Sequence, residues 1–100
     1  VHTFMRLKTK LTVEDAEIIG LKALTFLAED EGRLAKFLAF TGLDPADLRS
    51  RAGEPSTLQA VLEYLASDES LLLVFAAGAN LPPEHIGTAV TLLETAGSRA

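Results

Sequence analysis

Cysteine and tryptophan are absent from this 100-residue chain, and tyrosine occurs once. Because the chain has no cysteine, it contains no disulfide and no metal site held by thiolates. Aromatic residues make up 6% of the chain, whereas hydrophobic residues make up 48%, most of them Leu and Ala. Leu and Ala are strong helix formers, while strands favour aromatic and β-branched residues. The composition therefore predicts a helical core.

The chain also lacks a long uncharged run and an excess of positive charge. Its longest uncharged run, Ser70–Pro83, has 14 residues, whereas a membrane-spanning helix needs about 20 apolar residues. The formal net charge of −5 repels a phosphate backbone, so a nucleic-acid partner is disfavoured. The N-terminal VHTFMRLKTK is not followed by the apolar stretch and cleavage site of a secretion signal. We therefore expect a soluble protein without a membrane segment.

One domain is expected at residues 12–97, because a chain of this length can bury a core of its own. Residues 1–11 are expected to form a flexible arm and residues 98–100 a frayed tail. No segment alternates polar and apolar residues with a period of two over a useful length, so no strands are expected. The predicted fold class is all-α.

Six helices follow from apolar residues at three- and four-residue spacing. They are expected at Val13–Ala28, Glu31–Thr41, Pro45–Ala52, Pro55–Ala66, Glu69–Ala79 and Pro83–Gly97. The side chains of Thr12, Asp30, Asp44 and Asp68 can each accept a hydrogen bond from a free backbone amide at a helix start. The expected helix stops are Gly42, Gly53, Asn80 and Gly97.

The second half of the chain resembles the first. Ala23–Leu48 aligns without a gap on Val61–Ile86 at an offset of 38, with ten of 26 positions identical. Periods of this size are typical of helical repeats, in which each unit buries its apolar face against its neighbour. We expect a compact six-helix domain made of two stacked three-helix repeats.

The two copies differ most in the second helix of each unit. Arg33, Ala35 and Lys36 correspond to Leu71, Leu73 and Val74, so the run Leu71–Ala79 carries no charge. A helix that is apolar on every side is usually enclosed, so we expect this helix at the centre of the fold. The alternative is that part of it lies open as a partner or dimer surface.

A second difference concerns Ile18 and Leu21, whose counterparts Ser56 and Gln59 are polar. At 100° per residue they lie opposite the face of Ile19, Ala23 and Phe26. Such a pair is either covered by the N-terminal arm or the last helix, or it forms an interaction site. The candidate partner surface predicted from the sequence is Ile18, Leu21, Leu71 and Val74.

No catalytic, cofactor-binding or metal-binding residues are predicted. The pairs Asp30-Glu31 and Asp68-Glu69 occupy positions where helix N-termini favour carboxylates, so capping explains them better than acid–base chemistry. His2 and His85 have no converging ligands, and His85 is expected at the surface. We expect a non-enzymatic interaction or adaptor module that binds a protein partner or itself. The alternative is a regulator acting near nucleic acid through a small basic patch of Arg33, Lys36, Arg49 and Arg51.

Two blocks of the chain, LAEDEGRLAKFLAFTGLDPADLRSRAGEP and VLEYLASDESLLLVFAAGANLPPE, carry a family resemblance. They resemble small alphaproteobacterial helical proteins that are defined only as a domain of unknown function. The resemblance covers about Ala16–Glu84. It implies a bacterial, cytoplasmic, helical protein, and it supplies no catalytic residues. The N-terminal arm and the last helix match less well.

Overall fold

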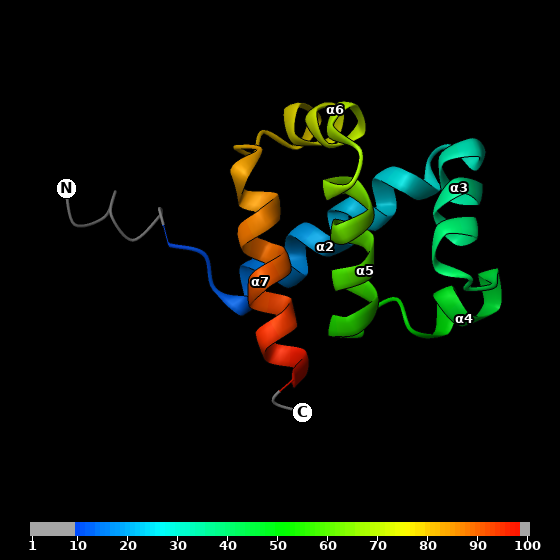
Figure 1. The fold of residues 1–100 in the computed structure, drawn as a ribbon, viewed down its shortest axis with the longest axis horizontal. Helices are drawn as coiled ribbons and strands as arrows, with labels where there is room; N and C mark the ends of the chain where they lie inside the picture. Colours follow the sequence, from blue (N-terminus) through cyan, green and yellow to red (C-terminus); the bar gives the residue numbers. More distant parts are fainter. Residues whose placement is uncertain (1–9, 99–100) are drawn as a thin grey trace.

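The computed structural model describes residues 10–98, which form six helices and no strand (Figure 1). The helices are α2 (Val13–Ala28), α3 (Glu31–Thr41), α4 (Pro45–Ser50), α5 (Pro55–Ala66), α6 (Glu69–Ala79) and α7 (Glu84–Ser98). The all-α prediction is confirmed. The expected arm and tail fall on residues 1–11 and 98–100, and of these, residues 1–9, 99 and 100 lie outside the described residues. Leu11, in the expected arm, packs against the core.

Four of the six predicted helix starts are confirmed by side-chain hydrogen bonds, while α5 starts at Pro55 without such a bond and α7 starts at Glu84, one residue after the predicted Pro83. Thr12 and Asp15 form a reciprocal capping box at the start of α2. The carboxylates of Asp30, Asp44 and Asp68 each accept a hydrogen bond from the backbone N–H three residues further on. The carboxylates at positions 30 and 68 therefore serve as helix caps.

Two predicted helix ends differ from the structure. α4 ends at Ser50 instead of Ala52, and α7 continues through Gly97 to Ser98. Among the described glycines only Gly42 has a positive φ, of 79°, and Asn80 takes the same left-handed conformation at φ 58°. Glycine ends a helix mainly by adopting that conformation, and Gly53 and Gly97 do not adopt it.

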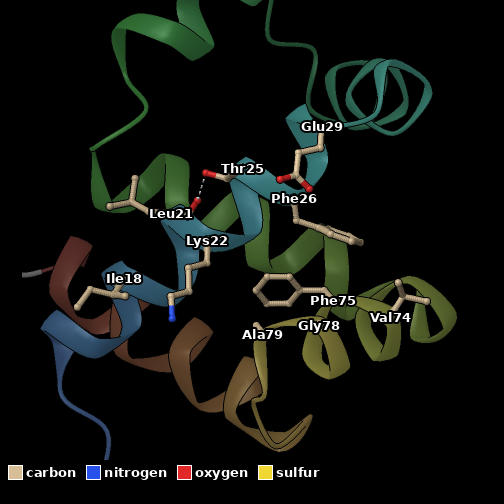
Figure 2. Close-up of a pocket in the computed structure, with 10 residues that line it drawn as sticks. All are labelled: Ile18, Leu21, Lys22, Thr25, Phe26, Glu29, Val74, Phe75, Gly78 and Ala79. Atoms are coloured by element: carbon tan, nitrogen blue, oxygen red, sulfur yellow. Dashed lines mark hydrogen bonds between the residues drawn. The ribbon is translucent and has the colours of Figure 1, made fainter.

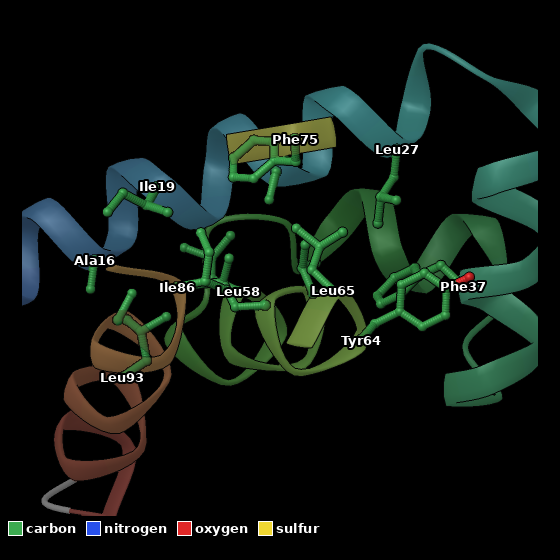
Figure 3. Packing of buried hydrophobic residues seen from close by; sticks show 14 of the residues in the cluster. Ala16, Ile19, Leu27, Phe37, Leu58, Tyr64, Leu65, Phe75, Ile86 and Leu93 are labelled. Atoms are coloured by element: carbon green, nitrogen blue, oxygen red, sulfur yellow. The ribbon is translucent and has the colours of Figure 1, made fainter. Parts of the chain in front are cut away.

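The central helix of the fold is α5. It lies beside α7 and is crossed by α2, so it contacts neighbours on more than one side (Figure 1). Its buried side chains form the middle of the core in Figure 3, where they meet Ile19 and Leu27 of α2 and Ile86 and Leu93 of α7. Burial of this large, shared apolar surface provides the main drive for folding.

The interpretation of α6 as the central helix is wrong. α6 lies across the ends of α5 and α7 (Figure 1), and it buries only Phe75 and Ala76. The short connections on both sides, residues 67–68 and 80–83, hold α6 across these ends. A helix in that place meets the core on one side only, whatever its composition.

The two related segments share local structure. α3 and α6 have the same bounds at the offset of 38, and both end on a left-handed residue, Gly42 or Asn80. Their third helices differ, because α7 has 15 residues and packs along α5 and α2, whereas α4 has six and buries only Leu48. The internal duplication stays a prediction that matched local structure supports.

Candidate functional site

An open groove of about 720 Å³ lies between α2 and α6 (Figure 2). α2 forms one wall and the C-terminal half of α6 forms the other. The groove is lined by Ile18, Leu21, Lys22, Thr25, Phe26, Glu29, Val74, Phe75, Gly78 and Ala79. It exists because α6 crosses the ends of α5 and α7 and meets α2 at only a few positions.

Three large aliphatic side chains on the groove walls are strongly exposed. Ile18 is 51% exposed, Leu21 44% and Val74 54%. These are three of the four residues that the sequence predicts as a partner surface, and the structure brings them to one groove. The fourth, Leu71, is half-buried against the core and does not line the groove.

The possible covers for Ile18 and Leu21 can be compared with the structure. α7, the last helix, packs on α2 but leaves both side chains exposed. The other expected cover, the N-terminal arm, falls mostly on residues 1–9, which lie outside the described residues. Within residues 10–98 the pair is therefore an open apolar surface.

The floor of the groove is aromatic. The rings of Phe26 and Phe75 lie 5.4 Å apart between centroids at an interplanar angle of 54°, a tilted arrangement that aromatic pairs favour. The guanidinium of Arg33 lies 4.3 Å from the centroid of the Phe26 ring, close enough for a cation–π interaction. These contacts hold the Phe26 ring in place at the bottom of the groove.

Small and polar residues complete the lining. A Cβ added at Gly78 would have no neighbour within 4 Å, so a ligand can approach the α6 backbone there. The Thr25 hydroxyl donates to the Leu21 carbonyl at 3.0 Å and is thereby satisfied. Lys22 and Glu29 place opposite charges on the α2 wall, seven residues or about two helical turns apart. The groove therefore offers an apolar surface with one positive and one negative side chain on its α2 wall.

Most of this lining could not be found from the sequence. Comparison of the two copies identifies Ile18 and Leu21 as anomalous on their own helix. Thr25, Gly78 and Ala79 carry no such signal, because their role depends on where α6 lies relative to α2. The sequence pattern places Phe26 on the inward face of its helix, and in the structure its half-buried ring also lines the groove.

His85 is half-buried, which differs from the expected surface position. Its Nδ1 atom is buried without a hydrogen-bond partner. The ring lines a smaller cavity of about 310 Å³ that also includes Asp15 and Lys22. Within residues 10–98 no three potential metal ligands converge.

The four basic residues considered for nucleic acid are not equivalent in the structure. Arg33 is partly buried with its guanidinium over Phe26. Lys36, Arg49 and Arg51 are exposed, and Arg49 lines a shallow cavity of about 270 Å³ beside Leu48. None of the helices that residues 10–98 form combines the length and apolar character that a bilayer crossing requires.

Comparison with known proteins gives a family but no activity. No curated protein and no solved structure matches the chain. One family model, described as "Protein of unknown function (DUF3572)", matches residues 13–96, from the first residue of α2 to near the end of α7. The chain therefore belongs to the DUF3572 family, which confirms the expected membership of a family of unknown function.

Proposed function

We propose that this chain is a non-enzymatic protein–protein interaction module that docks an apolar helical surface in the α2–α6 groove. The observation that carries the proposal is the gathering of Ile18, Leu21 and Val74, each about half exposed, around one groove. Full burial of such a side chain contributes about 1.5–3 kcal/mol, so covering the exposed half contributes on the order of 1 kcal/mol for each. An apolar partner therefore gains appreciable free energy by covering the groove.

A helix is the partner that fits the walls. Two neighbouring helices leave a furrow that a third helix fills with residues at three- and four-residue spacing. Gly78 and Ala79 allow a close approach on the α6 side, while Ile18 and Leu21 project from α2 one turn apart. Lys22 and Glu29 then lie at the edge of the interface, where charges contribute to partner choice.

The alternative function near nucleic acid has less support. Arg33 is engaged with Phe26, and the net charge of −5 opposes binding to phosphates. No observation within residues 10–98 favours it over the groove. The cytoplasmic location expected from the family resemblance is part of our proposal, and direct localisation in cells is the measurement that checks it.

Photo-crosslinking in cells tests the proposed function. We expect p-benzoylphenylalanine at position 21 to give a discrete covalent adduct, because that side chain contacts the docked partner. The same photoreactive residue at position 88, exposed on α7 away from the groove, should give none. An adduct of twice the 10.7 kDa chain mass indicates a second copy, and any other mass indicates a different protein.

A second change shows whether the adduct depends on the groove. Val74→Glu places a charge on the opposite wall and should abolish the adduct at position 21, whereas Thr91→Glu on α7 should leave it intact. Circular dichroism establishes that both variants keep their helices. Equal yields at positions 21 and 88, or an adduct that survives Val74→Glu, would contradict the proposal.

A further inference from the structure

We propose that residues 1–9 of the chain itself dock in the α2–α6 groove and compete there with the protein partner. This inference rests on the proposed function and adds a regulation of the same site. It is supported by the place where the described residues begin, by the length of the groove and by the opposite charges of the two parts of the chain.

The described residues begin at the edge of the groove. Lys10 and Leu11 line a cavity of about 310 Å³ together with Ile18 and Lys22. Ile18 and Lys22 also line the groove, so the two cavities adjoin each other. Leu11 packs against the core, which holds this point of the chain next to α2. Residues 1–9 are therefore attached where they can enter the groove at its Ile18 end.

Nine residues are enough to cover the groove. Its α2 wall runs from Ile18 to Glu29, eleven residues further on, which is about 16 Å at the rise of an α-helix. Nine extended residues span about 30 Å. About five of them therefore cross the groove, and about four remain for the approach from Lys10.

The composition of residues 1–9 suits an apolar groove. Four of the nine side chains are large and apolar: Val1, Phe4, Met5 and Leu7. The groove walls present three aliphatic side chains that are each about half exposed. Because both surfaces gain free energy by leaving water, residues 1–9 and the groove stabilise each other on contact.

The two parts of the chain also carry opposite net charges. Residues 1–9 contain Arg6 and Lys8 and no acidic residue, a net charge of +2. Residues 10–98 contain six Lys and Arg against 14 Asp and Glu, a net charge of −8. On the groove wall Lys22 repels the basic side chains and Glu29 attracts them, so the net attraction comes from the acidic surface as a whole.

A tethered occupant competes strongly with a free one. A short linker gives a tethered segment an effective concentration on the order of millimolar at its site. A partner binds only the chains whose groove is open, so its apparent affinity falls by the fraction that residues 1–9 occupy. A second copy of the chain, at a net charge of −5, is repelled at long range, whereas residues 1–9 are attracted.

An intramolecular disulfide tests the docking. The chain has no cysteine, so Phe4→Cys and Val74→Cys together introduce its only two thiols. In dilute protein under mild oxidation this pair should close within one chain, because docking brings residue 4 close to the α6 wall and a disulfide needs Cα atoms about 4.4–6.8 Å apart. The loss of free thiols in the monomer, measured by alkylation and mass spectrometry, follows the reaction.

Position 88 provides the matched control. Thr88 is exposed on α7, one turn from His85, which lines the same cavity as Lys10. It is therefore within reach of residue 4 but outside the groove. Phe4→Cys with Thr88→Cys should close several-fold more slowly than the pair with position 74. Circular dichroism verifies that both variants keep their helices.

The partner adduct at position 21 tests the competition. Phe4→Ser with Leu7→Ser in the full chain removes apolar surface without changing the charge, so it should raise the yield of that adduct in cells several-fold. Thr3→Ser with Thr9→Ser is the control, which should leave the yield unchanged because it removes no large apolar side chain.

The outcomes separate this inference from the proposed function. Equal rates of closure at positions 74 and 88 would overturn the docking of residues 1–9, even where position 21 captures a partner. An adduct yield that Phe4→Ser with Leu7→Ser leaves unchanged would overturn the competition. Rapid closure at position 74 without any adduct at position 21 would instead overturn the proposed function and support residues 1–9 as the occupant of the groove.

Discussion

Tyr64 of α5 contacts two phenylalanine rings of α3 that lie in very different surroundings. Its ring lies 5.5 Å from Phe37 and 5.2 Å from Phe40, measured between centroids. Phe37 is completely buried, whereas Phe40 is 60% exposed. Both rings contact Tyr64 at similar centroid distances, so burial is the main difference between the two residues.

Phe37→Ala should lower the free energy of unfolding by about 3–5 kcal/mol, because it removes buried surface and leaves a cavity. Such a loss is a large share of the roughly 5–15 kcal/mol that stabilises a domain of this size. Phe40→Ala should cost about 1 kcal/mol, since its ring is already in water and only the contact with Tyr64 is lost. Urea denaturation of both variants checks the values, and equal losses would contradict the assigned burial.

At the level of whole helices, the crossing of α2 over α5 depends on Gly20. A Cβ placed there would lie 2.8 Å from the Leu58 Cβ atom, which is fixed to the α5 backbone. Glycine inside a helix costs about 1 kcal/mol relative to alanine. At this position that cost is offset because the two helices can approach closely.

Gly20→Ala should destabilise the fold by up to about 2 kcal/mol, because an overpacking cost of about 1–3 kcal/mol is reduced by a gain of about 1 kcal/mol in helix propensity. Gly87→Ala is the matched control within α7, where an added Cβ would meet nothing within 4 Å. There only the propensity gain remains, so this variant should be more stable by about 0.5–1 kcal/mol. Denaturant unfolding distinguishes them, and a stabilising Gly20→Ala would show that the crossing can relax.

For the whole molecule, association must work against net charge. Each chain carries a formal charge of −5, so two copies repel each other at long range. A second copy that docked in the groove would have to offset this repulsion by burying the exposed side chains of Ile18, Leu21 and Val74. Salt screens the repulsion between exposed charges, so the repulsion weakens as the ionic strength rises.

The sequence alone determined the helices and most of their ends. Thr12, Asp30 and Asp68 act within one helical turn, so their effect does not depend on the rest of the fold. The same locality explains why comparing the two copies singled out Ile18 and Leu21, which are anomalous on their own helix. A glycine stop depends on the φ that the surroundings impose, so Gly53 and Gly97 were assigned less well.

Tertiary structure alone decided which helix is central and where the groove lies. The composition of α6 favoured the centre, but two short connections hold it across the ends of α5 and α7, and one side stays open. The floor of the groove, with Phe75 of α6 against Phe26 of α2, joins residues about 50 positions apart. Contacts of that range depend on how several helices share one core. The periodicity of a single helix shows which face is buried, but it does not predict which residue of another helix that face contacts.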